Sequence, residues 1–518
     1  MKTMRYKIIR GIIVLIAIRY LYVIFGSLAC KSDYSTPPMQ VSAALDSSTV
    51  VTIITRAVET AVRMNETVNV AVTDREGNIL GVFNMDQPPL VPENPLLGCI
   101  AKARTASYLS SNQHAFTTLT GCWITRPHYP PGVSNAPGGP LYGVTYSAIG
   151  GGDINRNDGT AGVLPAQGQQ GLTGAPGGVP IYINGVLVGG LGISFASDEG
   201  ALDVNSPLSR CAGTIINETI AFAALQGYTA SPGIQANQIL LDGISLAYSN
   251  LTNIPAINFT FTPAMILQYG TWDIRFPVRD APPQRLPDNG YIQGYSPSSG
   301  IYLSADEVNA IVMRCVDRSN RTRAAIRQPA GTSARVTISV ADVDGRILAI
   351  YRMADATIFG YDVAPQKART AVAFNSNHSL AQQLRNTIGI TQPMAVTTRT
   401  IGFLAQDYFP PGIDRDSLGI GTQPGPMWQG REFAWQASLG VQPFGNGITI
   451  FPGGMPLYRN GVLVGGIGIS GDGVDQDDYI AAAGAQGYEA PMSMQADQFS
   501  YLGVRLPYLK FPRNPELP

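Results

Sequence analysis

Hydrophobic residues recur at helical spacing near the start of each half of the chain. They are Val51, Ile54, Val58 and Val62 in the first half, and Val308, Ile311, Val312 and Cys315 in the second. Spacings of three and four residues predict an amphipathic helix in each half. Ser304 followed by Glu307 has the pattern of a capping box, so the second helix is expected to begin directly after Ser304.

After each predicted helix the apolar pattern changes to that of strands. Residues 68–86 (VNVAVTDREGNILGVFNMD) and 336–354 (VTISVADVDGRILAIYRMA) each hold two apolar runs around a Gly-containing turn. These segments predict a strand, a turn and a returning strand. Farther along, NGVLVGGLGIS (184–194) and NGVLVGGIGIS (460–470) differ at one position. Asn-Gly favours a type I′ turn, in which both central residues have positive φ, so both segments predict hairpins.

The two halves share further motifs in the same order, which indicates a tandem duplication. The pairs are KARTA at 102–106 and 367–371, HYPPGV at 128–133 with YFPPGI at 408–413, and ALQGY at 224–228 with GAQGY at 484–488. The repeated unit spans about 200 residues, which is too long for a solenoid repeat. A helix is expected to carry KARTA, and a final helix to end at Gly227 or Gly487. The glycines of the hairpins are expected to let another backbone or a ligand approach closely.

Composition adds that the fold is loop-rich and weakly charged. Charged residues make up 14 % of the 518 residues, with 57 Gly, 38 Pro and a net charge of −1. Ordinary globular domains are about 25 % charged. Since no dense run of Lys and Arg is present, the composition argues against nucleic-acid binding.

The N-terminus predicts export. MKTMRYKIIR is basic, an apolar run follows, and SLAC ends at Cys30. Residues 1–30 are typical of a secretory signal, and SLAC resembles a bacterial lipoprotein processing site, which predicts lipidation of Cys30. Arg19 interrupts the apolar run, and an uncleaved signal anchor is the alternative, since the run is about long enough to span a bilayer. Both interpretations predict an extracytoplasmic, membrane-anchored protein; secretion stays open.

The remaining cysteines leave two possibilities. Cys99, Cys122, Cys211 and Cys315 form no C-x-x-C, so a zinc ribbon, a thioredoxin motif and covalent haem attachment are unsupported. A disulfide among the first three is compatible with an extracytoplasmic location. The alternative is four small buried hydrophobic residues.

Residues 451–484 (FPGGMPLYRNGVLVGGIGISGDGVDQDDYIAAAG) resemble the signature of the GlcG/HbpS-like family. SVADVDGRILAIYRM and KARTAVAF fit earlier segments of the same family. The resemblance implies an α+β fold of two tandem domains, each an antiparallel sheet flanked by helices, with Gly/Pro-rich insertions. The expected parts are domain 1 at 40–248, with insertions near 127–178 and 195–213, a Pro-rich connector at 249–302, and domain 2 at 303–510.

The resemblance also implies a ligand class. Family members tend to oligomerise, several bind haem, some are linked to haem degradation and others to corrinoid or glycolate pathways. Haem or a related tetrapyrrole is therefore the expected cofactor, a homo-oligomer is expected, and storage, sensing or delivery is favoured over turnover. Haem degradation rests on the resemblance only, and no catalytic residue is assigned. The alternatives are a binder of a small organic acid or corrinoid, and a structural, self-associating surface protein without ligand.

Haem requires an apolar slot, an axial ligand and cations near the propionates. In the second copy His378 is the candidate iron ligand, Lys367 and Arg369 are the candidate propionate cations, and Phe374 lies between them in the sequence. Lys367 and His378 are eleven residues apart, about three helical turns, so one helix face is expected to carry both.

In the first copy the corresponding candidates are His114, Lys102 and Arg104. The alternative for both histidines is an exposed position at a helix end. His128 is interpreted as structural, and Tyr408, at the equivalent position of the second copy, is a weaker ligand candidate.

Two other motifs have simpler explanations. GIGISG (466–471) fits G-x-G-x-x-G, but Asp475, Asp477 and Asp478 follow at the next helix start and would repel a pyrophosphate. These aspartates are expected to complement the helix dipole, with a hard-cation site as the alternative. No G-x-S-x-G, Walker A or H-E-x-x-H motif is present.

Overall fold

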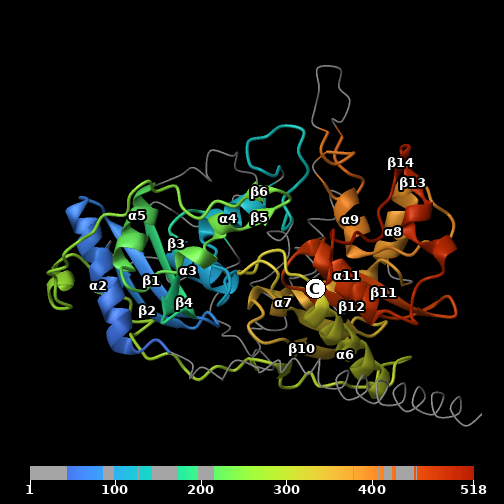
Figure 1. The fold of residues 1–518 in the computed structure, drawn as a ribbon, viewed down its shortest axis with the longest axis horizontal. Helices are drawn as coiled ribbons and strands as arrows, with labels where there is room; N and C mark the ends of the chain where they lie inside the picture. The colour runs from blue at the N-terminus through green and yellow to red at the C-terminus, as the bar shows by residue number, and fades with distance from the viewer. Residues whose placement is uncertain are drawn as a thin grey trace, which may run out of the picture. The chain divides into compact units, whose positions relative to one another are not determined.

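The α+β architecture occurs twice along the chain (Figure 1). The computed structural model describes residues 44–85, 98–126, 128–142, 173–195, 215–376, 379–406, 408–413, 423–427, 449–450 and 452–517. In the first copy the elements are α2 (Ser47–Arg63), β1 (Val68–Asp74), β2 (Ile79–Asn84), α3 (Gly98–Tyr108), α4 (Thr118–Ile124), β3 (Gly178–Ile183), β4 (Val186–Phe195) and α5 (Ile215–Ala224). In the second they are α6 (Ala305–Arg321), β9 (Thr337–Ala341), β10 (Ile347–Arg352), α7 (Phe359–Ala373), α8 (Ser379–Ile388), α9 (Thr398–Leu404), β11 (Gly454–Arg459), β12 (Val462–Ser470) and α11 (Val474–Gly484).

Each copy is built on a five-stranded antiparallel sheet. The strand orders are β3-β4-β1-β2-β7 and β11-β12-β9-β10-β8. The outermost strands β7 (Thr271–Trp272) and β8 (Gly290–Tyr291) pair with β2 and β10. Both come from the Pro-rich segment between the copies, which therefore adds one edge strand to each sheet. The fold class predicted from the sequence is confirmed, and residues 44–518 form one compact unit.

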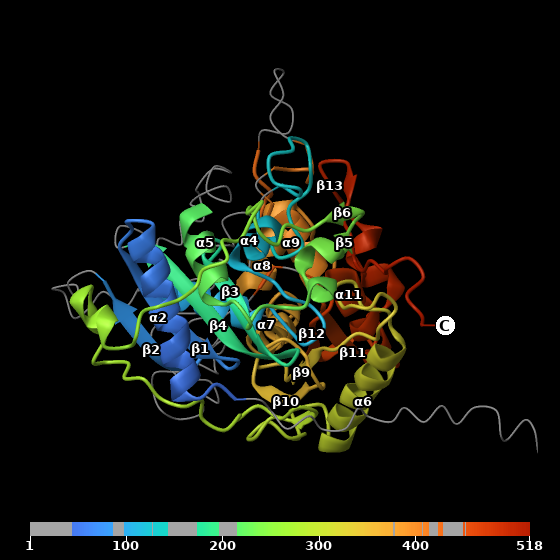
Figure 2. The ribbon, with the colours of Figure 1, turned by 60° about the vertical axis from the view of Figure 1, so that its left-hand side comes forward.

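Helices cover both faces of each sheet. In the first copy α2 and α5 lie together against it (Figures 1 and 2), and α6 and α11 do so in the second. α3 and α7, which carry the two KARTA motifs, pack against β4 and β12. Successive strand residues point to opposite faces, so Gly466 and Gly468 face α7 while Ile467 faces α11.

The first helix of each copy forms as its apolar spacing predicts. The four hydrophobic residues predicted for α6 are all buried, and Ser304 and Glu307 form the capping box. In α2 the buried stripe is rotated by about one residue. Ile54 and Val58 are buried, whereas Val51 and Val62 are only partly buried and Val50 takes an inner position.

The hairpin turns have the predicted backbone. Asn184 and Gly185 have φ of 52° and 81°, and Asn460 and Gly461 have φ of 52° and 77°. The last helices end slightly earlier than expected, at Ala224 and Gly484. A further turn leads from each to Gly227 and Gly487, whose φ values are 86° and 84°.

The cysteines divide between the two possibilities left by the sequence. Cys122 is disulfide-bonded, while Cys99 and Cys315 are buried free thiols. The partner of Cys122 therefore lies outside the described residues. The predicted signal, with Cys30, also lies outside them. Within the part of the chain that the structure describes, no helix has the length and apolar character needed to cross a membrane.

Candidate functional site

The glycine-rich strands bring the KARTA helices unusually close. A Cβ on Gly192 of β4 would lie 1.8 Å from the carbonyl oxygen of Cys99 in α3. On Gly468 of β12 it would lie 2.0 Å from the carbonyl oxygen of Ala364 in α7. The approaching group is thus the backbone of the helix, which explains why the motif occurs in both copies.

In the second copy this packing buries the predicted cations and gives each a partner. Lys367 Nζ donates to Asp477 Oδ2 at 2.8 Å and to the carbonyl oxygen of Ile469 at 2.7 Å. Arg369 Nε donates to the carbonyl oxygen of Gly345 at 2.8 Å. Both residues belong to α7, but the ammonium of Lys367 lies at the start of α11 and the guanidinium of Arg369 lies at the β9–β10 turn.

The first copy places its cations in the same way. Lys102 Nζ donates to the carbonyl oxygen of Ile193 at 3.0 Å, and Arg104 Nε to that of Gly77 at 3.0 Å. The counterpart of Asp477, however, is Asn217, as the alignment of ALQGY with GAQGY shows. The two copies thus share the lysine but not the acid beside it.

The aspartates at the start of α11 are held by cations. Arg399 of α9 donates to Asp475 at 2.7 Å and also to Asp478. Leu119 stands at the position of Arg399 in the first copy. Among the described residues, no group of three or more His, Cys, Asp or Glu side chains is arranged to hold a metal ion. The positions of the aspartates in the first turn of α11 agree with the expected role at a helix start.

Burial shifts the pKa values of both Lys367 and Asp477. Lys367 is 1 % exposed and Asp477 is 2 % exposed. Burial raises the pKa of Asp477 to about 7, although Lys367 pulls it down, and burial lowers the pKa of Lys367. Both shifts disfavour the charged form of the side chain, because burial removes water from both groups.

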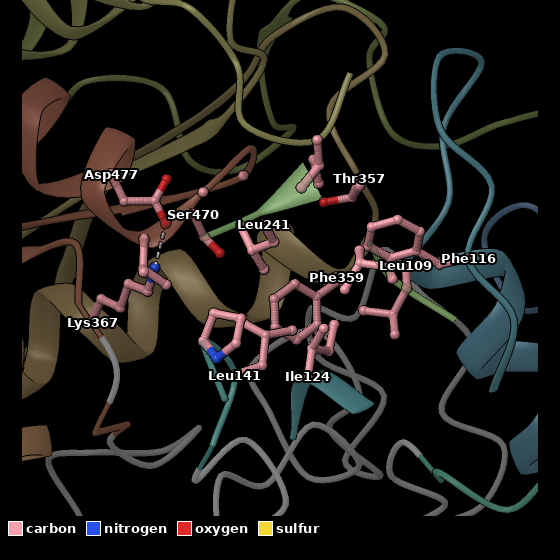
Figure 3. A pocket seen from close by; sticks show the side chains of 16 residues that line it. Leu109, Phe116, Ile124, Leu141, Leu241, Thr357, Phe359, Lys367, Ser470 and Asp477 are labelled. Carbon is pink, nitrogen blue, oxygen red and sulfur yellow. Dashed lines mark hydrogen bonds and ion pairs between the residues drawn. The ribbon is translucent and has the colours of Figure 1, made fainter. Parts of the chain in front are cut away.

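A largely apolar pocket begins at this pair. Its far wall comes from the first copy, through Leu109, Phe116, Ile124, Leu141 and Leu241. Figure 3 shows Lys367 and Asp477 at one end, Leu109 and Phe116 at the other, and the ring of Phe359 between them. A concave apolar site with a few polar groups at one end has the character of a small-molecule site.

His114 lies behind the pocket wall rather than in it. Its Nδ1 is 2.8 Å from Ser111 Oγ and its Nε2 is 3.1 Å from the carbonyl oxygen of Leu109. Since a carbonyl only accepts, Nε2 carries the proton and Nδ1 accepts from the serine hydroxyl. The ring also packs on Phe116, 4.9 Å away between centroids. His114 therefore supports two lining residues, and its role as an iron ligand stays a prediction.

The other haem candidates of the second copy do not share one helix. α7 ends at Ala373, and α8 begins at Ser379. The single helical face expected to carry Lys367 and His378 is therefore not formed. His378 lies outside the described residues, and Phe374 is part of the hydrophobic core.

His128 and Tyr408, at equivalent positions of the two copies, stack on each other. Their ring centroids are 5.9 Å apart and their planes are 6° from parallel. His128 Nδ1 also donates to the carbonyl oxygen of Ala136 at 2.8 Å. The contact agrees with the structural interpretation of His128.

A buried ion cluster, made by Arg327, Asp355 and Asp472, also holds the pocket rim in place. Arg327 Nη1 is 2.7 Å from Asp355 Oδ2, and its Nε donates to Asp472. Asp355 also pairs with Arg75 of the first copy at 2.7 Å. Ile326, Thr357 and Gly471–Gly473 flank the cluster in the sequence, and residues of these segments line the pocket. No local pattern in the sequence indicated this cluster, because its members come from separate loops.

Comparison with known proteins agrees with the tandem arrangement. The model of a family described as "Haem degrading protein HbpS-like" matches residues 45–203 and 318–486, more than half of the chain. The chain belongs to the HbpS-like family. The resemblance inferred from the glycine-rich motifs is confirmed, and the two matched regions of this HbpS-like chain contain its two hairpins.

Curated relatives match a shorter part. The corrinoid adenosyltransferase PduO of Salmonella typhimurium (strain LT2) is 27 % identical over 176 residues, which are 34 % of this HbpS-like chain and 38 % of that protein. PduO of Citrobacter freundii is 28 % identical over 184 residues, 35 % and 41 % of the two chains. The chain thus spans less than half the length of these curated relatives.

Three solved structures are similar to about a third of the chain. They are a PduOC:haem complex (24 % identity, 36 % of this chain and 95 % of that one), Klebsiella pneumoniae ORFY (18 %, 37 % and 94 %) and a double mutant of Streptomyces reticuli HbpS (20 %, 36 % and 88 %). The TM-score is 0.22 in each case.

Proposed function

We propose that this HbpS-like protein binds haem or a related tetrapyrrole in the pocket lined by both copies, for storage, sensing or delivery. The observation that carries the proposal is the pocket, with apolar walls along its length and a lysine at one end. That combination suits a flat apolar ring bearing carboxylates. The family description, a haem-degrading protein, supports the same ligand class.

The residues present fit such a ligand in two respects. Phe359 offers an aromatic surface for the ring, and Lys367 offers a cation for a propionate. Of the two histidine candidates for the iron, His114 is the one among the described residues. Its ring can bind the metal only if it gives up its hydrogen bond to Ser111 or to Leu109. When bound, haem would supply the chemistry of its iron, which axial ligation tunes.

A corrinoid is the second candidate. The two curated relatives are corrinoid adenosyltransferases, and corrinoids are also large modified tetrapyrroles. Competition between haemin and cobinamide for the full-length protein separates the candidates, since the natural class should bind at lower concentration.

Haemin titration of the full-length protein, followed through the Soret band, tests the proposal. Leu241→Asp places a carboxylate in the pocket wall and is expected to weaken binding at least tenfold. Leu240→Asp is the matched control, because Leu240 is the neighbouring residue of the same short strand and is 67 % exposed. His378→Ala and His114→Ala report on ligation through shifts of the band. A spectrum of free haemin alone, or equal affinity in both leucine variants, would reject the pocket.

We also propose that the protein works outside the cytoplasm, anchored through Cys30. The basic and apolar N-terminal segments and the SLAC sequence support this. Metabolic labelling with a radioactive fatty acid should label the wild type and not Cys30→Ser. If both remain unlabelled and both fractionate with the membrane, the uncleaved anchor is the correct alternative.

A further inference from the structure

Among the described residues that line the pocket, two are ionisable, Lys367 and Asp477. They face each other at 2.8 Å, and both are almost fully buried. The second carboxylate oxygen, Asp477 Oδ1, is buried and has no hydrogen-bond partner. A buried acceptor without a partner is unfavourable, so the acid is not fully stabilised by its surroundings.

Charge balance limits what this end of the pocket can bind. The ammonium and the carboxylate together are neutral. A ligand carboxylate that reached Lys367 would leave two negative groups beside one positive group in a site of low dielectric constant. Isolated buried charge is strongly unfavourable, and proteins usually respond by neutralising a group. Two carboxylates that share one site behave in the same way, because one of them takes up a proton.

We propose that the pocket selects ligands with a carboxylate, which takes the place of Asp477 on Lys367 while Asp477 takes up one proton from solvent. This inference rests on the proposed function and specifies its polar end. The ion pair between Lys367 and Asp477 is replaced by an ion pair between Lys367 and the ligand carboxylate. The proton neutralises Asp477, so the net charge of the occupied site is unchanged.

The surrounding charged groups have partners of their own. On α11, Asp475 and Asp478 are held by Arg399 of α9. Asp472, before α11, is held by Arg327. From α6, Arg314 donates to the carbonyl oxygen of Gly484 and Arg318 to the hydroxyl of Tyr479. Asp477 is the acid that faces Lys367 directly, and burial raises its pKa to about 7.

The first copy shows that the fold accepts an uncharged side chain at the position of Asp477. There Asn217 occupies the position of Asp477, close to Gly177, while Lys102 keeps its bond to Ile193. Asp477→Asn therefore copies an arrangement already present in the same protein. It removes the titrating group and leaves the shape of the side chain almost unchanged.

The test uses 1-pyrenebutyrate, an apolar ring with one carboxylate that is ionised near neutral pH, and its methyl ester as probes of the full-length protein. Calorimetry in two buffers of different ionisation enthalpy counts the protons taken up at about pH 8. The wild type should take up close to one proton, and its affinity should fall by up to about tenfold per pH unit above the Asp477 pKa. Asp477→Asn should take up none and bind with an affinity independent of pH. Asn217→Asp, outside the pocket lining, is the matched control and should behave as the wild type.

The outcomes separate this inference from the proposed function. Equal binding of acid and ester, or equal proton uptake in the wild type and Asp477→Asn, would overturn the carboxylate exchange even if haemin binds. Proton-coupled binding of pyrenebutyrate that Asp477→Asn abolishes would uphold it, even if haemin fails to bind and another carboxylate is the natural ligand.

Discussion

Burial decides how the ionisable side chains of this protein behave. Lys102 and Lys367 are almost fully buried. Each donates to the carbonyl oxygen of the isoleucine that precedes the serine at the end of the glycine-rich run in β4 or β12. Exposed cations would instead be hydrated, and their pairs would contribute about 0–1 kcal/mol. The sequence identified these lysines as candidates, but only their burial shows that their charge is tied to a specific partner.

His114 shows the same effect in a titrating group. Burial lowers the pKa of His114 to about 3, and the positive charge of Arg327 acts in the same direction. The folded protein therefore holds the imidazole neutral, whereas the unfolded chain binds a proton below its ordinary pKa of 6.5. Since the folded pKa is depressed, the contribution of this residue to stability is present above pH 6.5 and is lost as the pH falls toward 3.

His114→Gln is accordingly expected to reduce the acid sensitivity of the fold. In the wild type this residue alone should lower the free energy of unfolding by about 1.4 kcal/mol per pH unit below the unfolded pKa. Urea unfolding at about pH 7 and about pH 4.5 measures the difference. His128→Gln, at a partly exposed ring, is the control for the loss of a histidine side chain as such. A variant with the same slope as the wild type would show that His114 is protonated in the folded state.

At the scale of elements, the duplicated glycine-rich strand is explained by helix packing. In β12 the glycines alternate with isoleucines, so one face admits the backbone of α7 and the other packs under α11. The strand pattern and the Asn-Gly turn are local properties, and the sequence was sufficient to predict both. The identity of the approaching group was left open, because a ligand and a helix backbone require the same small residue.

Gly468→Ala should be strongly destabilising. The new Cβ would lie 2.0 Å from the carbonyl oxygen of Ala364, so α7 or β12 must move. We expect a loss of about 3 kcal/mol in the free energy of unfolding, as for overpacked cores. Gly233→Ala is the control, because a Cβ there meets nothing within 4 Å and should change stability little. Similar denaturation midpoints for both variants would contradict the packing argument.

At the scale of the whole molecule, Asp355 links the two copies. Its carboxylate forms ion pairs with Arg327 and Arg75. It also accepts a hydrogen bond from the backbone N–H of Asn112 at 3.0 Å. Burial alone would raise the pKa of Asp355, but the two guanidinium groups outweigh it and hold the pKa well below its usual range. Loss of this carboxylate would remove an ion-pair partner from both guanidinium groups at once.

Asp355→Asn should therefore weaken the junction as a whole. Removing one member of a buried ion pair typically costs about 3–5 kcal/mol. Calorimetry should show a lower melting temperature, with separate transitions for the two copies. Asp317→Asn, whose carboxylate is 66 % exposed in its pair with Arg321, should stay within about 0.5 kcal/mol of the wild type. An unchanged, single transition in Asp355→Asn would show that other contacts hold the copies together.

Helical spacing, strand alternation and turn chemistry are encoded by near neighbours, so the sequence alone determined the duplication, the main helices and hairpins of each copy and their family. The short helices α4, α8 and α9 were not predicted. The pocket was decided by tertiary structure. Lys367 and Asp477 are 110 residues apart, and Arg75 and Asp355 are 280 residues apart. No local pattern specifies which of several cations and acids will meet after burial. The partners of the charged groups, and the apolar wall that one copy provides for the other, therefore depended on how the two copies pack.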